Sequence, residues 1–186
     1  MKKIILVIAL SILLIPMVLA DDVSLNVNMP NEVNKGDNFT INIDVNVKNK
    51  DISGFECTVK IPIENVDNIN ITSITGNEEI KKEAGKFYEI KKKDSLVSIR
   101  FATFGTPLNS DFHLMTINAV ALKEGNVSFT FESIASDENG QRIPVDKKTT
   151  DLIIIDNNNK TVESSENFLS SIINAIMNFL KSILGG

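Results

Sequence analysis

Strict alternation of apolar and polar residues from Phe39 to Val47 is the feature that most limits how this chain can fold. The turn signal Lys35-Gly36-Asp37 lies just before it. A period of two sends successive side chains to opposite faces of a strand, so that one face is buried and the other is solvated. The same period recurs at 23–29 and at alternate positions from Phe55 to Ile63. The chain is therefore expected to be a sheet protein with one buried face per strand.

Turn and loop residues divide the chain into nine predicted strands. These are 23–29, 38–47, 53–62, 68–75, 86–91, 95–104, 112–122, 126–134 and 142–155. One segment, Asn77 to Ala84, departs from the pattern, because acidic residues come first, basic residues follow, and Gly85 is a stop signal. This order predicts a short helical turn. No internal repeat of 20 to 50 residues is present, which favours a single domain.

The first 20 residues are typical of an export signal. Lys2 and Lys3 precede an uncharged run that ends in Val18-Leu19-Ala20, and small or short side chains stand where a signal peptidase cleaves. The alternative is a retained membrane anchor, since the run is at the lower limit of length for crossing a bilayer. Pro16 and the acidic pair Asp21-Asp22 favour cleavage. Residues 1–20 are therefore interpreted as a signal peptide.

The net charge and the cysteine content indicate which partners are disfavoured and whether disulfide bonds are expected. The formal net charge is −5, and cleavage after Ala20 would remove two lysines and make the chain more acidic. A nucleic-acid partner is therefore disfavoured. Cys57 is the single cysteine and shares a strand face with Phe55 and Val59, so it is expected to be a small buried hydrophobe. No disulfide, metal or cofactor is predicted.

The order of these signals resembles the cohesin domain, a secreted β-sandwich module that receives dockerin domains in cellulosomes and also occurs in non-cellulosomal archaeal and bacterial surface proteins. Val33–Ile41 is similar to the first turn and second strand of the family, and Ile52–Val59 to the third strand. Lys123–Phe129 and Ser136–Val145 are similar to the turns that flank the penultimate strand. Where the family often has Tyr-Asp-Pro after the third strand, this chain has Ile61-Pro62-Ile63.

The resemblance implies an all-β fold, a nine-stranded jelly-roll β-sandwich, here over residues 21–156, in which the flatter sheet face binds a partner. Alternation along two of the strands leaves five polar side chains pointing outward. If these strands are sheet neighbours, as in cohesins, the five form a polar partner-binding face. An ordinary solvated sheet face is the alternative. The residues are Glu56, Thr58, Lys60, Ser98 and Arg100.

The sequence gives little support for catalysis. Its one histidine, His113, lies in an apolar run, and no nucleophile, phosphate-loop or metalloprotease motif occurs. Asp137 to Gly140 fits a turn and not a calcium loop, because the first position of such a loop would be Ala135. The chain has no Trp and one Tyr, so stacking on a sugar is disfavoured relative to binding of a protein. The protein is not expected to be an enzyme.

Four sequons make N-glycosylation possible in an organism with the machinery. Their number is close to what chance gives for a chain this rich in Asn, Ser and Thr. Unmodified polar residues are therefore the alternative. The acceptor positions are Asn38, Asn70, Asn126 and Asn159.

The C-terminal residues 157–166 are typical of a linker, and 167–186 of an amphipathic helix. The helix is too short and too polar on one side to cross a bilayer. A membrane-surface tether, a helix–helix oligomerisation element and docking onto the chain's own sandwich all fit it. Its predicted apolar face consists of Phe168, Leu169, Ile172, Ile173, Ile176, Phe179, Leu180, Ile183 and Leu184.

Together these features predict an exported, non-enzymatic, cohesin-like binding or scaffold module. It would act outside the cell, attached to the cell surface or to the outer face of the membrane. A protein partner, of the dockerin type if the resemblance extends to binding, is favoured. A carbohydrate-binding module that takes a polysaccharide, or a structural envelope subunit without a separate ligand, are the alternatives.

Overall fold

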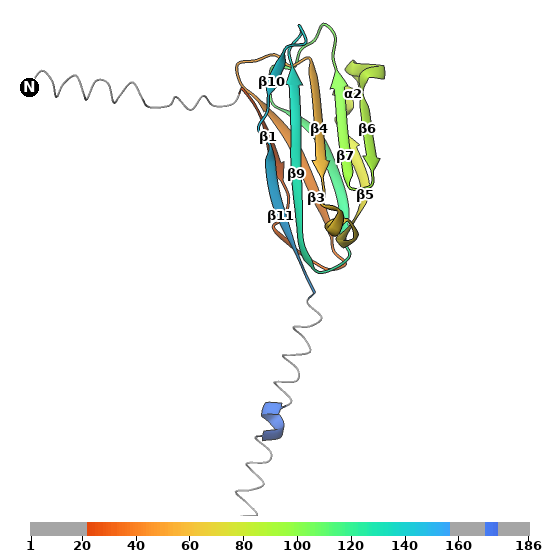
Figure 1. Cartoon of the computed structure of the whole chain (residues 1–186), viewed down its shortest axis with the longest axis vertical. Coiled ribbons are helices and arrows are strands. Elements are labelled where there is room, and N and C mark those ends of the chain that lie inside the picture. Colours follow the sequence, from red (N-terminus) through yellow and green to blue (C-terminus); the bar gives the residue numbers. More distant parts are fainter. Residues whose placement is uncertain (1–21, 157–169, 175–186) are drawn as a thin grey trace, which may run out of the picture.

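The computed structural model describes residues 22–156 and 170–174. Residues 22–156 form a sandwich of two sheets, and eleven strands are assigned within them (Figure 1). The strands are β1 (Val23–Asn28), β2 (Glu32–Asn34), β3 (Asn38–Val47), β4 (Gly54–Lys60), β5 (Ile69–Gly76), β6 (Glu89–Lys93), β7 (Leu96–Ala102), β8 (Phe112–Ala121), β9 (Gly125–Ser136), β10 (Arg142–Pro144) and β11 (Lys148–Ile155).

The smaller sheet has the order β1-β3-β8-β5 and is antiparallel throughout. Its centre is β3, the strand predicted from the alternating run. Phe39, Ile41, Ile43 and Val45 point inward from it and are all buried. The partner strand β8 pairs Ile41 with Ile117. The buried face predicted from the period of two is thus confirmed at this strand.

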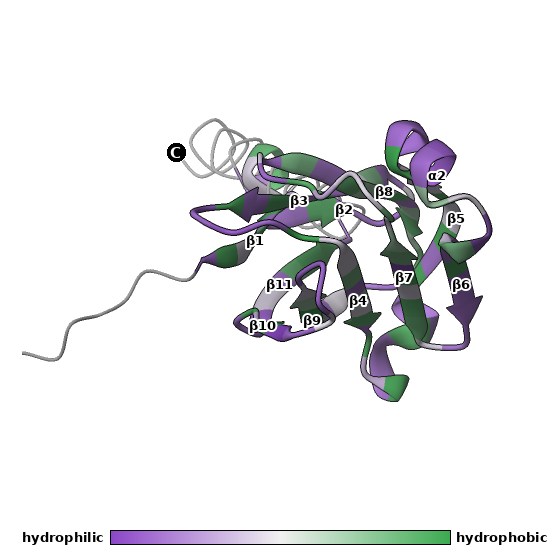
Figure 2. Cartoon of the chain, turned by 90° about the horizontal axis from the view of Figure 1, so that it is seen from above, coloured by the Kyte–Doolittle hydropathy of each residue, from purple (hydrophilic) through white to green (hydrophobic). Residues whose placement is uncertain are grey.

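The larger sheet has the order β2-β11-β9-β4-β7-β6, and β10 also pairs with β9. Its pairs are antiparallel except β2 with β11, which run parallel. β9 and β4 lie side by side near the middle of the sheet, and β6 forms one edge. Seen from above, the two sheets are separate layers (Figure 2). The buried apolar side chains of both sheets form one core cluster.

Aromatic rings join the two layers at one end of the core. Phe55 of β4 stacks near Phe101 of β7, with ring centroids 6.2 Å apart. Phe112, from β8 of the other sheet, meets both rings edge-on at 6.1 and 6.0 Å. Such edge contacts suit the charge distribution of aromatic rings. Cys57, next to Phe55 on the same face, is fully buried, as predicted.

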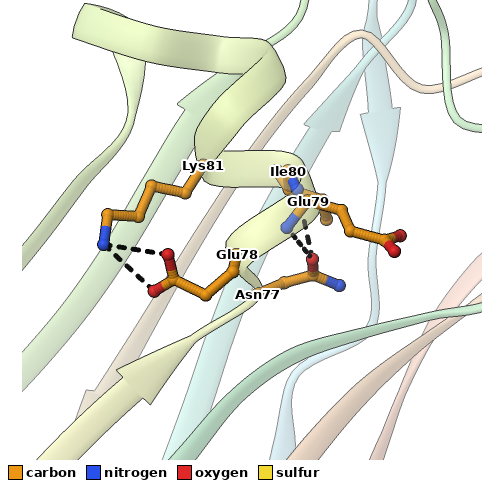
Figure 3. Close-up of polar contacts among 5 residues, drawn as sticks. All are labelled: Asn77, Glu78, Glu79, Ile80 and Lys81. Carbon is orange, nitrogen blue, oxygen red and sulfur yellow. Dashed lines mark hydrogen bonds and ion pairs between the residues drawn. The ribbon is translucent and has the colours of Figure 1, made fainter.

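The predicted helical turn is the helix α2 (Glu78–Ala84), which follows β5. Its N-cap is Asn77, whose side-chain oxygen accepts hydrogen bonds from the backbone N–H groups of Glu79 and Ile80 (Figure 3). Lys81 lies 3.0 Å from Glu78 one turn earlier. The helix ends at Gly85, where the backbone φ of +54° suits a residue without a side chain.

Three strands differ from the sequence prediction. β2 was not predicted, because three residues are too few to show a period. The predicted strand 142–155 is two strands, β10 and β11, separated at Val145–Lys147. The predicted strand 86–91 starts later, as β6, because Gly85–Phe87 forms a turn of 3-10 helix first. A second 3-10 segment, Ile63–Asn68, follows β4.

Near the C-terminus, residues 170–174 are helical and their side chains are exposed. The rest of the predicted amphipathic helix, the whole of the predicted linker 157–166 and the predicted signal peptide lie outside the described residues. No helix among the residues that the structure describes is long and apolar enough to cross a membrane.

Candidate functional site

The five predicted patch residues come together on the outer face of the larger sheet. β4 and β7 are neighbours, so Glu56 lies opposite Arg100 and Thr58 lies opposite Ser98. Lys60 lies at the end of the same row, opposite Leu96. Their inward neighbours fill the core, which leaves these five side chains outward and at least partly exposed. The adjacency on which the prediction depended is therefore present.

Strands on both sides widen this surface, which we call the β9-β4-β7-β6 face. From β9, Thr130, Glu132 and Ile134 pair with Lys60, Thr58 and Glu56, respectively. From β6, Glu89 and Lys91 pair with Arg100 and Ser98. The outward residues of the face are Thr130, Glu132, Ile134, Glu56, Thr58, Lys60, Leu96, Ser98, Arg100, Glu89, Lys91 and Lys93.

Two carboxylates on the face are each held by two cations. Glu89 contacts Arg100 at 2.6 Å and Lys91 at 2.7 Å, and Glu132 contacts both Lys60 and Lys147. The hydrogen bond from Lys91 is the main cause that lowers the pKa of Glu89, and the hydrogen bond from Lys60 does the same for Glu132. Both carboxylates therefore stay ionised at pH values below the range in which a glutamate side chain usually becomes protonated.

Glu56 differs from these two, because it makes no ion pair with any residue that the structure describes. It stands between two hollows on the face and forms part of the wall of both. Its carboxylate, and the neighbouring hydroxyls of Thr58 and Ser98, are therefore open to hydrogen bonds from outside the molecule.

The first hollow, which we call the aromatic groove, has a volume of about 550 Å³. It lies where β4, β7 and β9 meet the segment that follows α2. Its wall includes two exposed apolar side chains, Phe87 and Ile134, whose exposed fractions are 47% and 44%. Its polar lining comes from Glu56, Lys86, Tyr88, Glu89, Arg100 and Ser136.

The aromatic side of this groove extends beyond Phe87. Phe104, a residue that is 71% exposed, packs its ring against that of Phe87, and the two ring centroids are 4.8 Å apart. The Lys86 ammonium lies 5.1 Å from the centre of the Phe87 ring, within the range of a cation–π contact. Large exposed apolar side chains gathered at a groove are typical of a binding surface.

The second hollow, which we call the basic groove, has a volume of about 430 Å³ and lies along β4, β9 and β10. It shares Glu56 and Ile134 with the aromatic groove, so the two are continuous parts of one surface. Its charged lining consists of Glu56, Lys60, Glu132, Arg142 and Lys147.

Sequence reasoning missed the apolar part of the site. Ile134 carries a signal, because it is an apolar residue at an outward position of β9, between buried Ser133 and buried Ala135. Phe87 and Phe104 fall at the ends of the predicted strands 86–91 and 95–104, but in the structure they lie in a turn of 3-10 helix and in a loop, so alternation does not show that they meet.

His113 lies in an apolar run of the sequence, but its side chain points out of the core and is partly exposed. Leu114 and Met115 are both buried, because a bulge interrupts the pairing of β8 with β3 there. His113 and Thr116 therefore both point outward. The imidazole Nδ1 lies 2.7 Å from an oxygen of Asp44, and Nε2 lies 2.9 Å from the hydroxyl of Thr116.

Thr116 in turn donates a hydrogen bond to the side-chain oxygen of Asn42, so this row of polar groups is satisfied within the outer face of the smaller sheet. Asp44, His113 and Thr116 line neither groove of the larger sheet. Nor do the residues 22–156 and 170–174 contain a group of three or more His, Cys, Asp or Glu side chains that could hold a metal ion.

The sequons divide between the two sheets. Asn38 and Asn70 are exposed on the smaller sheet, where both pair with Val120 of β8 and so lie in one row. Asn126 is exposed near the start of β9 in the larger sheet. Asn159 lies outside the described residues.

The architecture is that of the cohesin modules, a class of β-sandwich. A cohesin module from a family 33 glycoside hydrolase of Clostridium perfringens is similar over 74% of this chain and 99% of its own, with a TM-score of 0.59 and 14% identity. A non-cellulosomal cohesin from the archaeon Archaeoglobus fulgidus is similar over 75% and 97%, with a TM-score of 0.55 and 8% identity.

A third similar structure is a cohesin from scaffoldin B of Acetivibrio cellulolyticus in complex with a mutant dockerin. It covers 72% of this chain and 98% of its own, with a TM-score of 0.53 and 14% identity. No protein-family model matches the sequence, and no curated protein matches it either. The likeness therefore establishes a cohesin-like domain by its fold.

Proposed function

We propose that this chain is a non-enzymatic protein-binding module that recognises its partner through the β9-β4-β7-β6 face. The observation that carries the proposal is the combination of two grooves and an unpaired carboxylate, Glu56, on one exposed sheet face. The inward side of the same strands packs the core, so the face is held rigid. A rigid surface loses little conformational freedom on binding, which favours affinity.

The comparisons support a protein as the ligand. One similar cohesin is in complex with a dockerin, and this chain shares its fold at 14% identity. We extend this to the present chain as a dockerin-like partner. The four rings of Phe87, Phe104, Tyr88 and buried Phe55 are not arranged as an exposed flat platform for a sugar: one is buried and another is half-buried. A polysaccharide is therefore the less favoured ligand.

We further propose that the module is exported and acts at or near the cell surface. Residues 1–20 would be removed as a signal peptide, 21–156 would form the module, and 157–166 would link it to the helix 167–186. The helix would hold the module at the membrane surface through its apolar side chains. Self-association through this helix, and its docking on the sandwich, are the alternatives. Co-sedimentation with liposomes that is lost only when residues 164–186 are removed would support the tether, and a mass that rises with concentration without lipid binding would support self-association.

The test is capture of a partner by the immobilised full chain from envelope extract, followed by analysis of the retained proteins and glycans. Thr58→Trp would put a large side chain in the middle of the face, where no ion pair is disturbed. Asn26→Trp is the matched control, because Asn26 is exposed on β1 of the other sheet. We expect a stoichiometric protein partner that Thr58→Trp abolishes and Asn26→Trp leaves bound.

Two results would contradict the proposal. Retention of polysaccharide without protein would favour a carbohydrate-binding module. Recovery of further copies of this chain alone would favour a structural envelope subunit.

A further inference from the structure

Both arginines of this chain border the two grooves. The sequence contains two arginines among 19 basic residues. Arg100 lines the aromatic groove and Arg142 lines the basic groove, and both side chains are exposed. Arginine differs from lysine in presenting a planar fork of donors that matches a carboxylate with two parallel hydrogen bonds.

The grooves are also more basic than the molecule as a whole. Taken together, their walls hold more cationic than acidic side chains, although the chain carries a net charge of −5. The basic groove carries the excess, since in the aromatic groove Lys86 and Arg100 stand against Glu56 and Glu89. Lys86 and Arg142 form no ion pair with the residues that the structure describes. The cations are Lys60, Lys86, Arg100, Arg142 and Lys147, against Glu56, Glu89 and Glu132.

Apolar walls stand directly beside these cations. Phe87 and Ile134 face the aromatic groove with nearly half of each side chain exposed, and Arg100 belongs to the same wall. Arg100 is 62% exposed even while it contacts Glu89, so part of its guanidinium is free for a second acceptor. An aliphatic side chain of a partner would gain by covering the two apolar residues.

We propose that the partner presents an acidic peptide segment in which an aliphatic side chain is flanked by carboxylates. The aliphatic side chain enters the aromatic groove between Phe87 and Ile134, and a carboxylate pairs with the guanidinium of Arg100. The inference rests on the proposed function, since it describes the partner of the same face. Charge complementarity favours this occupant, since the Lys86 ammonium has no carboxylate partner among the described residues and the Arg100 side chain is 62% exposed.

The experiment is an NMR titration of the isotope-labelled full chain with three capped peptides at millimolar concentration. The first peptide is Gly-Glu-Ile-Glu-Gly, the second replaces both Glu with Gln, and the third replaces Ile with Ser. We expect saturable shifts at the backbone amides of Ala102 and Ser136, which line the aromatic groove, with the first peptide. Binding of the other two should be at least about ten-fold weaker.

Matched variants separate the guanidinium from charge in general. Arg100→Gln should weaken binding of the first peptide about ten-fold. Lys123→Gln is the control, because Lys123 also pairs with a carboxylate, that of Asp67, but lies outside the face and lines neither groove. For the apolar wall, Ile134→Thr should weaken binding several-fold, while Leu122→Thr, which removes an exposed apolar residue outside the face, should not.

Four outcomes would overturn the inference. Equal binding of the Gln peptide would remove the role of the carboxylates. Absence of shifts, while an extract protein still binds in a manner that Thr58→Trp abolishes, would reject this segment and retain the proposed function. The predicted linker 157–166 contains two glutamates, Glu163 and Glu166. Shifts that appear only after both are changed to Gln would identify this segment of the chain as the occupant. A partner that binds outside the face would reject both proposals.

Discussion

Cys57 shows how burial at one residue makes the stability of the fold depend on pH. Burial raises the pKa of its thiol to about 11, since the thiolate would lose its hydration in the core. The Ser133 hydroxyl opposes this slightly, although the contact does not reach hydrogen-bond geometry. In the unfolded chain the thiol ionises near its ordinary pKa of about 8.5. Folding therefore favours the protonated thiol.

The first prediction follows from the sign of this shift. The stabilisation is fully present below about pH 8.5 and is lost as the pH rises toward 11, because the unfolded state then binds fewer protons. Over that range the loss is about 3 kcal/mol. Urea unfolding at pH 8 and at pH 10.5 measures it, with Cys57→Ala as the control for other groups. An equal pH dependence in wild type and Cys57→Ala would contradict the prediction.

Gly76 and Tyr88 form a second contact at the scale of single residues. The Tyr88 hydroxyl occupies the space that a side chain at Gly76 would need, 1.6 Å from the position of a Cβ. This hydroxyl is buried and has no hydrogen-bond partner among the described residues. Burial also raises the pKa of Tyr88. Because Gly76 has no side chain, Tyr88 can occupy this place, and Tyr88 forms part of the wall of the aromatic groove.

We therefore predict that Gly76→Ala lowers the free energy of unfolding by about 1–3 kcal/mol, because Tyr88 must move. In a Tyr88→Ala background the same change should cost clearly less, which a double-mutant cycle by urea unfolding measures. Tyr88→Phe should be neutral or stabilising, since the lost hydroxyl has no partner. Additive costs for Gly76→Ala and Tyr88→Ala would show that the two residues are not coupled.

At the scale of elements, α2 depends on its cap. Asn77 makes two kinds of contact: its oxygen caps the helix, and its Nδ2 donates to the backbone oxygen of His113 at 2.9 Å. Asn77 thus starts α2 through its side-chain oxygen and joins the helix to β8 through its side-chain nitrogen. A seven-residue helix has little stability of its own, so these contacts and the burial of Ile80 hold it.

The third prediction is that Asn77→Ala costs about 1–2 kcal/mol of unfolding free energy. Asn77→Asp keeps the cap and loses the donor to His113, so it should cost less than Asn77→Ala. Thermal unfolding of the three proteins compares them. If Asn77→Asp were as destabilising as Asn77→Ala, the tie to β8 and not the cap would be the dominant contribution.

The long strands and α2 could be predicted from the sequence, whereas the short strands could not. The long strands and α2 follow from local periodicity and from cap and stop residues, which act within a few positions. β2 and the break between β10 and β11 do not, because short strands depend on their partners. The bulge at Leu114 reverses the alternation of β8, and only pairing with β3 shows that His113 points outward.

The same limit applies to the candidate site. Alternation assigned Glu56 and Arg100 to outward positions, but their adjacency came from the family resemblance, since periodicity in one strand carries no information about its neighbour. The structure confirms that adjacency. Phe87 enters the aromatic groove through a tertiary contact of a turn, which no local pattern indicates.

At the scale of the whole molecule, one core supports both sheets and therefore both grooves. β9 pairs with β4, β10 and β11, and its inward Phe129 and Phe131 are fully buried among residues of both sheets. Loss of packing there would disturb each neighbour of β9. The binding face is thus expected to persist only while the entire sandwich is folded.

The last prediction is that the sandwich unfolds in a single transition. Tyr88 is the one tyrosine, and there is no tryptophan, so fluorescence reports on the aromatic groove, while far-UV circular dichroism reports on both sheets. The two urea curves should coincide in wild type. Phe131→Ala should lower the free energy of unfolding by about 3–5 kcal/mol, and both probes should report the same loss, because the cavity lies in the shared core. Earlier loss of the tyrosine signal would instead mean that the groove unfolds separately, and the face could then rearrange on binding without loss of the fold.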